Sequence, residues 1–539
     1  MPRQTTFLWF VSPESVGRGE RVAYPDTMST TANRVIKNTG YLYAKMGITM
    51  FISLYTTRLI LNSLGASDFG IFNIVGGAIA MLGFLNAAMA SATQRFMSYS
   101  EGEGNKEKQK SIFNVSFILH LGISLVVGIA LLIAGYFFFN GILNIPEDRI
   151  FAAKVVYGSL IVSTMFTVMT VPYDAAMNAH ENMKYYAIVG IFESFLKLAV
   201  AFACVYTIFD KLIVYGSLMA CIPLITLTIM RVYCHKNYEE CVIAPHTYWN
   251  KGLMKEMTSF AGWIFFGSFS ALVGNYGNGL VLNHFYGVTL NAASGIANQI
   301  NGQLLVLTNN MLKAVNPVIT KSEGSGNRNK MLDISTTSCK FSFAMLAIIA
   351  IPFILEMPFI QKLWLKNVPT WAVLFSQLQL VRTLTEQITI SYGTAISAEG
   401  HIAKYNICTS ILNLLPVSFL YILFSLGYPP VTMYVLNISI FGLLLDIVKV
   451  YFAHRNCGLK YKSFIHKLFF PLVTSFVITL IIGYIPHLWI EEGWIRLFIT
   501  FFLCIISYIL LFWYMCINNL EKSVIVSTWK KVHKIRLNL

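Results

Sequence analysis

Charged residues are scarce in this sequence. Only 12% of its 539 residues are Asp, Glu, Lys or Arg, about half of the roughly 25% that is usual in soluble domains. Long polar connections are also missing, since the longest stretches between apolar runs, near residues 235–256 and 316–337, are too short to fold as a domain. The sequence therefore excludes a soluble protein and leaves no room for a separate catalytic domain.

Cysteines with the spacing of a metal site or a redox motif are absent as well. The nine cysteines include no CxxC and no His/Cys ligand spacing, so we expect no disulfide, no zinc or other metal, and no cofactor. A signal peptide is not expected, because residues 1–27 hold only a short apolar patch around Phe7 to Val11. Met28 is a second candidate for the start of translation.

Apolar runs of about 20 residues make up most of the chain instead. A helix of that length crosses roughly 30 Å of hydrocarbon at 1.5 Å per residue, and 56% of the residues are hydrophobic. The pattern predicts an all-α, polytopic membrane protein of about fourteen transmembrane helices. The expected spans are 40–62, 69–93, 113–138, 155–177, 186–208, 212–234, 257–283, 290–315, 338–357, 369–395, 405–426, 430–452, 468–488 and 494–517.

The net charge of +15 is better explained by orientation in a membrane than by a nucleic-acid partner. Most cations lie in connections on the side of the two termini. Fewer lie on the other side, namely Arg149, Lys154, Lys211, Lys362, Lys366 and Arg496, with Arg58 near a span end. Because short loops rich in Lys and Arg remain in the cytoplasm, we expect both termini to be cytoplasmic and no nucleic acid to be bound.

An internal repeat is the most specific signal in the sequence. Three blocks recur with offsets between 219 and 225 residues, which indicates one duplication. The blocks are 59–62 with Gly65 and 70–73, which recur at 280–283 with Gly287 and 295–298; SEGEGNK at 100–106, which recurs as SEGSGNR at 322–328; and Tyr173, Ala176, Ala179 and Lys184-Tyr185, which recur as Tyr392, Ala395, Ala398 and Lys404-Tyr405.

The repeat predicts the arrangement of the helices. Six spans separate equivalent residues, so the two halves run parallel and form two six-helix lobes related by an axis along the membrane normal. We expect an N-terminal extension at 1–35, a first lobe at 36–250, a second lobe at 251–466, and two extra helices with a basic tail at 467–539. Gly70 and Gly295 lie where short outer turns enter the next span, where we expect them to adopt backbone angles that other residues resist.

Ionisable residues inside the spans are few, and each costs on the order of 2.5–3.5 kcal/mol unless it has a partner or water. Glu193 and Lys197 are four residues apart, as are Arg382 and Glu386, so each pair can meet on one helix face. These pairs are either self-neutralised structural pairs or cavity cations held by carboxylates. Asp446 and Lys449 are expected to be structural, and Lys313, near a span end, is able to snorkel.

Arg58 and Asp174 break the symmetry of the repeat, because their equivalents are Gly279 and Gly393. A guanidinium binds two phosphate oxygens at once, and Lys45 adds a point charge, so an anion site is indicated. The alternative for Arg58 is snorkelling to the headgroups. Asn275 and Asn278 suit sugar hydroxyls, although such residues also join helices to one another.

These motifs resemble a known group of proteins. The block LxLNxLGxxxFGIFNIV after Arg58, the SEGxGN loop, the block YDAAMNAHENMKYYAI and the twelve-plus-two spans look like the polysaccharide transporters of the MOP superfamily, in particular the O-antigen (Wzx-type) flippases. The resemblance covers nearly the whole chain from about Ala32. It implies a V-shaped, MATE-like carrier, which is not an enzyme, in the bacterial inner membrane.

The resemblance also implies a substrate and residue roles. The substrate would be an undecaprenyl-diphosphate-linked oligosaccharide, flipped from the cytoplasmic to the periplasmic leaflet by alternating access, with other polysaccharide assembly proteins as partners. The role of receiving the diphosphate and sugar falls on Arg58 by motif position, and on Lys45, Lys197 and Arg382 by cavity placement. A proton or sodium ion would couple through Asp174, Glu193 or Glu386.

Two other functions are consistent with the same sequence. A cation-coupled multidrug extruder of the superfamily would share the repeat, but its cavity should favour acidic residues, whereas cations and anions are balanced here apart from the extra Arg58. A membrane-embedded polymerase or glycosyltransferase would need an acid/base or metal constellation on a sizeable outer loop. The outer loops are short, and Glu491-Glu492 is expected to be a solvated pair.

Overall fold

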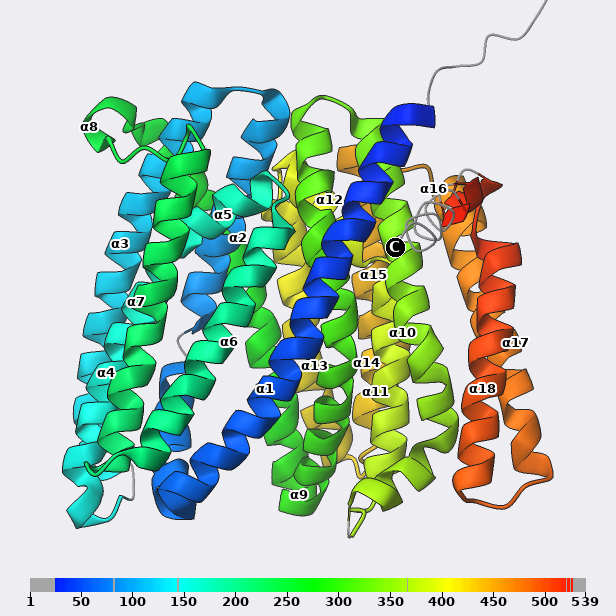
Figure 1. Ribbon diagram of the computed structural model, residues 1–539. Coiled ribbons are helices and arrows are strands. Elements are labelled where there is room, and N and C mark those ends of the chain that lie inside the picture. Colours follow the sequence, from blue (N-terminus) through cyan, green and yellow to red (C-terminus); the bar gives the residue numbers. More distant parts are fainter. Residues whose placement is uncertain are drawn as a thin grey trace, which may run out of the picture.

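The computed structural model describes residues 25–80, 83–142, 145–365, 367–519, 521–523 and 525–526, and within these ranges it is helical without strands (Figure 1). The expected N-terminal extension up to residue 24, the alternative-start question and the basic tail from residue 527 fall outside this part. The all-α membrane architecture predicted from the apolar runs is confirmed.

The helices follow one another along the chain as tall, roughly parallel rods. The first lobe contains α1 Pro25–Ala80, α2 Gly83–Glu103, α3 Lys106–Phe137, α4 Ile150–Met169, α5 Val171–Ala179, α6 Met183–Tyr206 and α7 Lys211–Asn237, followed by the short α8 Pro245–Tyr248. The second contains α9 Lys251–Gly324, α10 Arg328–Trp364, α11 Ala372–Gln387, α12 Ile390–Glu399, α13 Ala403–Ser425, α14 Thr432–Ser439 and α15 Phe441–Cys457. The chain ends with α16 Tyr461–Phe464, α17 Phe470–Tyr484 and α18 Trp494–Leu511.

Fewer helices pass a test of length and apolar character than there are helical segments in the described chain. Among the described residues, ten helices are long and apolar enough to cross a membrane, or eleven if the bent pair in α1 counts as one span. The fourteen expected spans each have a helical counterpart, but α9 contains two of them, the span expected at 69–93 is divided between α1 and α2, and α11–α12 is polar and broken. Three of the fourteen helical segments therefore do not count as separate spans when each described helix is judged by its length and apolar character.

Two equivalent glycines bend the long helices. Gly65 in α1 has φ 78° and Gly287 in α9 has φ 79°, a left-handed conformation that is strained for residues with a Cβ. The expectation that Gly70 and Gly295 adopt the special angles is wrong, because both lie in helical backbone. Each long helix bends at Gly65 or Gly287, and the helix after the bend is already regular at Gly70 and Gly295.

The repeated SEGxGN motif has the same local structure in both lobes. Gly104 and Gly326 have φ 72° and 74° and end the preceding helix. Asn105 and Asn327 then act as N-caps, accepting hydrogen bonds from the backbone N–H of Lys108 and of Lys330. Each copy therefore stops one span and starts the next with a single tight turn.

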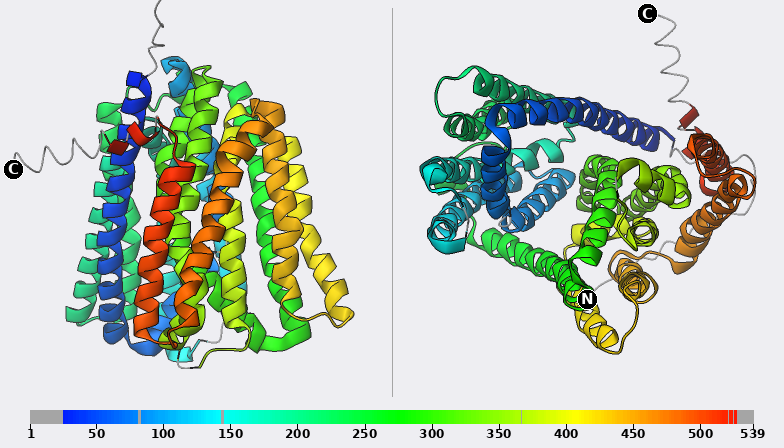
Figure 2. Two further views of the ribbon diagram at one scale, coloured as in Figure 1. Left: turned by 90° about the vertical axis from the view of Figure 1, so that its right-hand side faces the viewer. Right: turned by 90° about the horizontal axis from the view of Figure 1, so that it is seen from below.

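The last two long helices lie outside the body that the two lobes form. Both α17 and α18 pack against α10 of the second lobe, and Figure 2 shows them as an outer pair beside that lobe. We call the side with Pro25 and the α2–α3 and α9–α10 turns the terminal face, which is the top of Figure 1. The largest buried apolar cluster joins α2 and α5 of the first lobe to α9, α10 and α12 of the second.

Candidate functional site

The two lobes meet in a reciprocal contact at the terminal face. Gly102 packs against the backbone of Lys321, and Gly324, the repeat equivalent of Gly102, packs against the backbone of Tyr99, the equivalent of Lys321. A Cβ at either glycine would lie 2.9 Å from the opposing carbonyl carbon, closer than real Cβ atoms come. Small residues let helices approach closely, so these glycines bring the lobes together here around a pseudo-two-fold axis.

Cations from each lobe reinforce this contact by capping a helix end in the other. Arg95 on α2 donates from Nη2 to the carbonyl oxygen of Ala398 at 2.8 Å and from Nε to that of Ser397 at 3.2 Å. Lys321 on α9 donates to the carbonyl oxygen of Ala179 at 3.4 Å, and Ala179 is the repeat equivalent of Ala398. Positive charge is stabilised at helix C-termini, so the terminal face is closed by two related contacts.

Ion pairs complete the closure. The Lys321 ammonium lies 3.6 Å from Glu101 Oε1 and 3.5 Å from Glu181 Oε1, both in the first lobe. Glu181 is buried and has φ 55°, and its carboxylate also pairs with Arg34 at 3.3 Å while its carbonyl oxygen accepts from Asn38. The turn between α5 and α6 is thus held both to the start of α1 and to the second lobe.

A charged cluster lies just beneath the closed face, on the seam between the lobes. Lys45 Nζ of α1 lies 4.2 Å from the centroid of the Tyr186 ring, and Lys313 Nζ of α9 lies 3.6 Å from the same centroid. Both ammonium charges also act on the Asp174 carboxylate of α5. All four side chains are half-buried, and the Asp174 Oδ1 atom has no hydrogen-bond partner within the described residues.

This cluster is positively charged overall. Two cations face one carboxylate, and the next acidic residue, Glu193, is already paired with Lys197 at 2.7 Å. Contact with an aromatic face stabilises an ammonium by about 0.5–1 kcal/mol, and by about 2 kcal/mol or more when it is desolvated. Tyr186 therefore holds the two cations near each other without neutralising them, which suits an anionic ligand.

A second charged cluster lies within the second lobe. The Lys449 ammonium lies 3.6 Å from Asp446 Oδ1 and 3.8 Å from Glu386 Oε1, and Arg382 Nη1 lies 3.9 Å from Asp446 Oδ2. Thr389 donates to Asp446 Oδ1 at 2.6 Å. Two cations balance two carboxylates, so this network is neutral overall.

The expected pairing within α11 is corrected by this network. Arg382 and Glu386 make no ion pair with each other in the described structure, and each pairs with α15 instead. The pair Asp446 and Lys449, expected to be structural, is the centre of the network. Helix spacing allowed the i,i+4 pair, but α15 packs closely enough to supply better-placed partners.

The remaining predicted residues are not part of either cluster, although the charge of Glu193 acts on Asp174 and Tyr186. Glu193 and Lys197 pair with each other as expected, and both are partly exposed. Arg58 is exposed on α1 and makes no ion pair with any described residue. Asn275 is exposed on α9, whereas Asn278 is buried with an Oδ1 that has no hydrogen-bond partner among the described residues. Of the predicted residues, the structure therefore brings Lys45 and Asp174 together in the first cluster and Arg382 and Glu386 together in the second.

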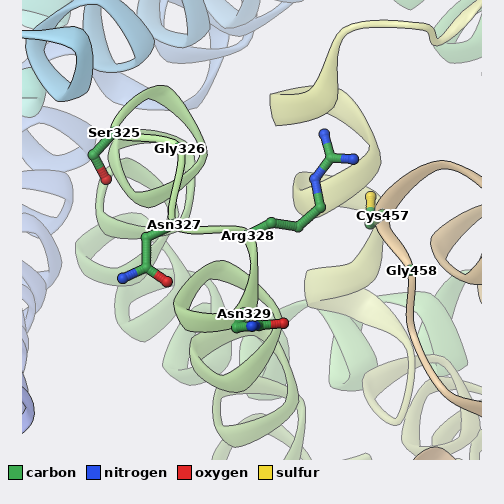
Figure 3. Close-up of a pocket in the computed structure, with 7 residues that line it drawn as sticks. All are labelled: Ser325, Gly326, Asn327, Arg328, Asn329, Cys457 and Gly458. Atoms are coloured by element: carbon green, nitrogen blue, oxygen red, sulfur yellow. The ribbon is translucent and has the colours of Figure 1, made fainter. Parts of the chain in front are cut away.

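A pocket of about 520 Å³ at the terminal face involves the second SEGxGN copy (Figure 3). Its lining comes from residues 325–329 and from Cys457 and Gly458. The one cation in the lining, Arg328, donates from Nε to Glu323 Oε1 at 3.0 Å and from Nη1 to the carbonyl oxygen of Asn456 at 3.1 Å. The guanidinium of Arg328 is thus already hydrogen-bonded to other residues of the chain, and we assign no binding role to this pocket.

Sequence reasoning missed Tyr186, Arg95 and Glu181, and it treated Lys313 as a snorkelling residue. Tyr186 and Glu181 lie in the YDAAMNAHENMKYYAI block, so the repeated motif was the available signal. Lys313 points to Tyr186 rather than to the headgroups. No local pattern predicts this contact, because it joins residues 127 positions apart in different lobes.

Several solved membrane transporters have the same fold as this chain. Solved structures with the same fold include the crystal structure of MATE in the bent conformation (15% identity, TM-score 0.69, covering 81% of this chain and 98% of that chain). They also include a MOP superfamily transporter from Pyrococcus furiosus (15%, 0.66, 83% and 100%) and a multidrug resistance MATE family transporter in an outward-facing conformation (15%, 0.67, 82% and 100%). The fold is that of a V-shaped membrane transporter, and such proteins are not enzymes.

The family model for polysaccharide biosynthesis proteins matches residues 35–323, more than half of the chain. The chain belongs to this family, and it is a polysaccharide transporter of the MOP superfamily. No curated protein matches the chain.

Proposed function

We propose that the protein flips an undecaprenyl-diphosphate-linked oligosaccharide, such as an O-antigen, capsule or exopolysaccharide unit, from the cytoplasmic to the periplasmic leaflet. The observation that carries this proposal is the seam cluster, where Lys45 and Lys313 from different lobes meet on Tyr186 with Asp174 as the one carboxylate. An excess of positive charge at the meeting point of the lobes favours a diphosphate. A cation extruder should have the opposite excess.

The other predicted residues have roles consistent with this substrate. Arg58, exposed and unpaired among the described residues, offers a fork of donors to phosphate oxygens. Asn275 would meet sugar hydroxyls. Lys197 and Arg382 are less available, because each is already near a carboxylate.

The closed terminal face supports alternating access. With both termini in the cytoplasm of a bacterium, as the cation distribution predicts, the closed face is the cytoplasmic one. Export of negative charge across an inside-negative membrane is then favoured by about 2.3 kcal/mol per charge per 100 mV. Other polysaccharide assembly proteins would supply and receive the substrate.

Ion coupling fits Asp174 better than the other two predicted carboxylates. Glu193 is paired with Lys197, and Glu386 lies 3.8 Å from Lys449 on α15 of the same lobe. Asp174 instead faces Lys313, which belongs to the other lobe. Separation of the lobes would withdraw this cation, and a proton or sodium ion would take its place.

Flipping by the purified protein in liposomes tests the proposal. The substrate is a fluorescent, short-chain polyprenyl-diphosphate saccharide, and the wild type is compared with the double variant Lys45→Gln/Lys313→Gln. Charged hydrogen bonds are worth about 1.5–3 kcal/mol each, so flipping should fall at least tenfold. Lys184→Gln, an exposed lysine on the same helix as Tyr186, is the matched control and should retain activity. Transport of an organic cation in place of the lipid would contradict the proposal.

A further inference from the structure

A second pocket at the terminal face has a different character from the one in Figure 3. It has a volume of about 670 Å³ and lies between α2 of the first lobe and α9, the α12–α13 turn and α15 of the second. It is thus placed at the ends of membrane-spanning helices, on the seam between the lobes. None of the roles proposed above uses it.

The rim of this pocket has more positive charge than the protein neutralises. Its lining contains Arg95, Lys255, Lys404 and Arg455 but only one carboxylate, that of Glu256. Arg95 is committed to the carbonyl oxygens at the end of α12. The other three cations are exposed and have no carboxylate within 4 Å in the described part of the chain. An anion of the right size would therefore meet three available cations.

The deeper part of the pocket is apolar. The α9 residues that line it recur at helical spacing from Gly252 through Lys255 to Phe260 and Trp263. The eleven helical steps from Gly252 to Trp263, at 1.5 Å each, extend about 16 Å along one helix face, from the charged rim to an aromatic floor that Phe452 also joins. A small soluble anion would leave this floor unused, whereas an anionic amphiphile would cover both parts.

We propose that this pocket binds an anionic glycerophospholipid, with its phosphate between Lys255, Lys404 and Arg455 and the upper part of an acyl chain along Phe260 and Trp263. Basic pockets between transmembrane helices at the headgroup level are the sites expected to hold such lipids. Phe96 of α2 also lines the pocket beside Arg95, so a lipid bound there contacts both lobes. A ligand that contacts both lobes in the closed state favours that state.

Lipid retention by the full-length protein tests this proposal. The purified protein is exposed to phosphatidylglycerol or to zwitterionic phosphatidylethanolamine, and bound lipid is counted by native mass spectrometry. Each basic residue near a membrane surface contributes about fivefold to the affinity for anionic lipid, so Lys255→Gln/Lys404→Gln/Arg455→Gln should weaken phosphatidylglycerol binding on the order of a hundredfold. Phosphatidylethanolamine binding should be weak in both proteins.

A charge-matched control distinguishes binding in this pocket from general electrostatic attraction of anionic lipid to the terminal face. Lys236→Gln/Lys460→Gln/Lys462→Gln removes three exposed cations of the same face outside the pocket and should retain phosphatidylglycerol. Equal loss in both triple variants would overturn the proposal, as would retention in both. Binding of polyprenyl diphosphate but not of phosphatidylglycerol would also overturn it, because the pocket would then receive the substrate. All six side chains are replaced at exposed positions, and binding is counted on folded protein regardless of flipping activity.

Discussion

Replacement of Gly102 or Gly324 by alanine should open the terminal face. At each position the new Cβ would lie 2.9 Å from a carbonyl carbon of the other lobe, which belongs to Lys321 or Tyr99. The opposing atoms are backbone, so no side-chain rotation relieves the clash. Overpacking of this kind costs about 1–3 kcal/mol, and since about 1.4 kcal/mol is a tenfold change, the closed state should lose roughly 5- to 150-fold in population relative to the open one.

Distances between spin labels measure this opening directly. Labels at Glu107→Cys on α3 and Asn329→Cys on α10 place one probe in each lobe on exposed positions of the terminal face. The exposed Cys221 and the half-buried Cys408 are replaced by serine in this background. The protein with both wild-type glycines should give one short distance between the two labels. In either alanine variant, part or all of the distance distribution should move to a longer value. The double variant should not be additive, because the two contacts are neighbours.

Gly302→Ala is the matched control for these variants. Gly302 is helical, lies on the same helix as Gly324, and has no neighbouring atom within 4 Å of the position that a Cβ would take. Alanine is favoured over glycine inside a helix, so this variant should keep the short distance. If Gly102→Ala and Gly324→Ala both keep the wild-type distance and the wild-type flipping rate, the reciprocal contact is not the gate.

Three further results are expected. Asp446→Asn should lower the thermal unfolding midpoint, because breaking a buried ion network costs about 3–5 kcal/mol, and an unchanged midpoint would refute the network. Burial alone would raise the pKa of Asp210, but the hydrogen bond and charge of Arg149, together with the backbone N–H groups of Leu212 and Ile213, outweigh burial and lower that pKa below 3.8. The Arg149–Asp210 pair should therefore stabilise the wild type fully above pH 3.8, and this stabilisation should be lost as the pH falls through the lowered pKa of Asp210. The thermal unfolding midpoint of Asp210→Asn should not show this part of the pH dependence. Arg58→Lys should retain part of the flipping activity that Arg58→Ala loses, because the charge remains while the two-donor fork is lost, and equal activity in both would assign Arg58 to the lipid surface.

The repeat made much of the fold predictable. The match of SEGEGN to SEGSGN placed Gly102 and Gly324 at equivalent positions, and the structure shows that each contacts the other copy. The block containing Gly65 and Gly287 located both helix bends, although the special angles were assigned to neighbouring glycines. Duplication preserves backbone geometry, so a sequence match indicates where both copies turn.

The candidate site was less predictable because its contacts join distant residues. The sequence shows Lys45 and Asp174 as isolated charges within spans, and nothing in it indicates that Lys313 approaches them from the other lobe. Spacing on one helix likewise suggested the pair Arg382 and Glu386, whereas packing of α15 decided the actual partners. Charge inventory predicts which residues need partners, but the packing of helices determines which partners they find.

Transport under an imposed membrane potential tests the central claim most directly. Wild-type protein in liposomes is offered a polyprenyl-diphosphate saccharide and, separately, an organic cation. The account predicts that the lipid moves from the side of the terminal face to the opposite side, and that a potential negative on the side of the terminal face accelerates it, since each exported charge gains about 2.3 kcal/mol per 100 mV. Movement of the organic cation without movement of the lipid would contradict the account and would make the protein an extruder with the same fold.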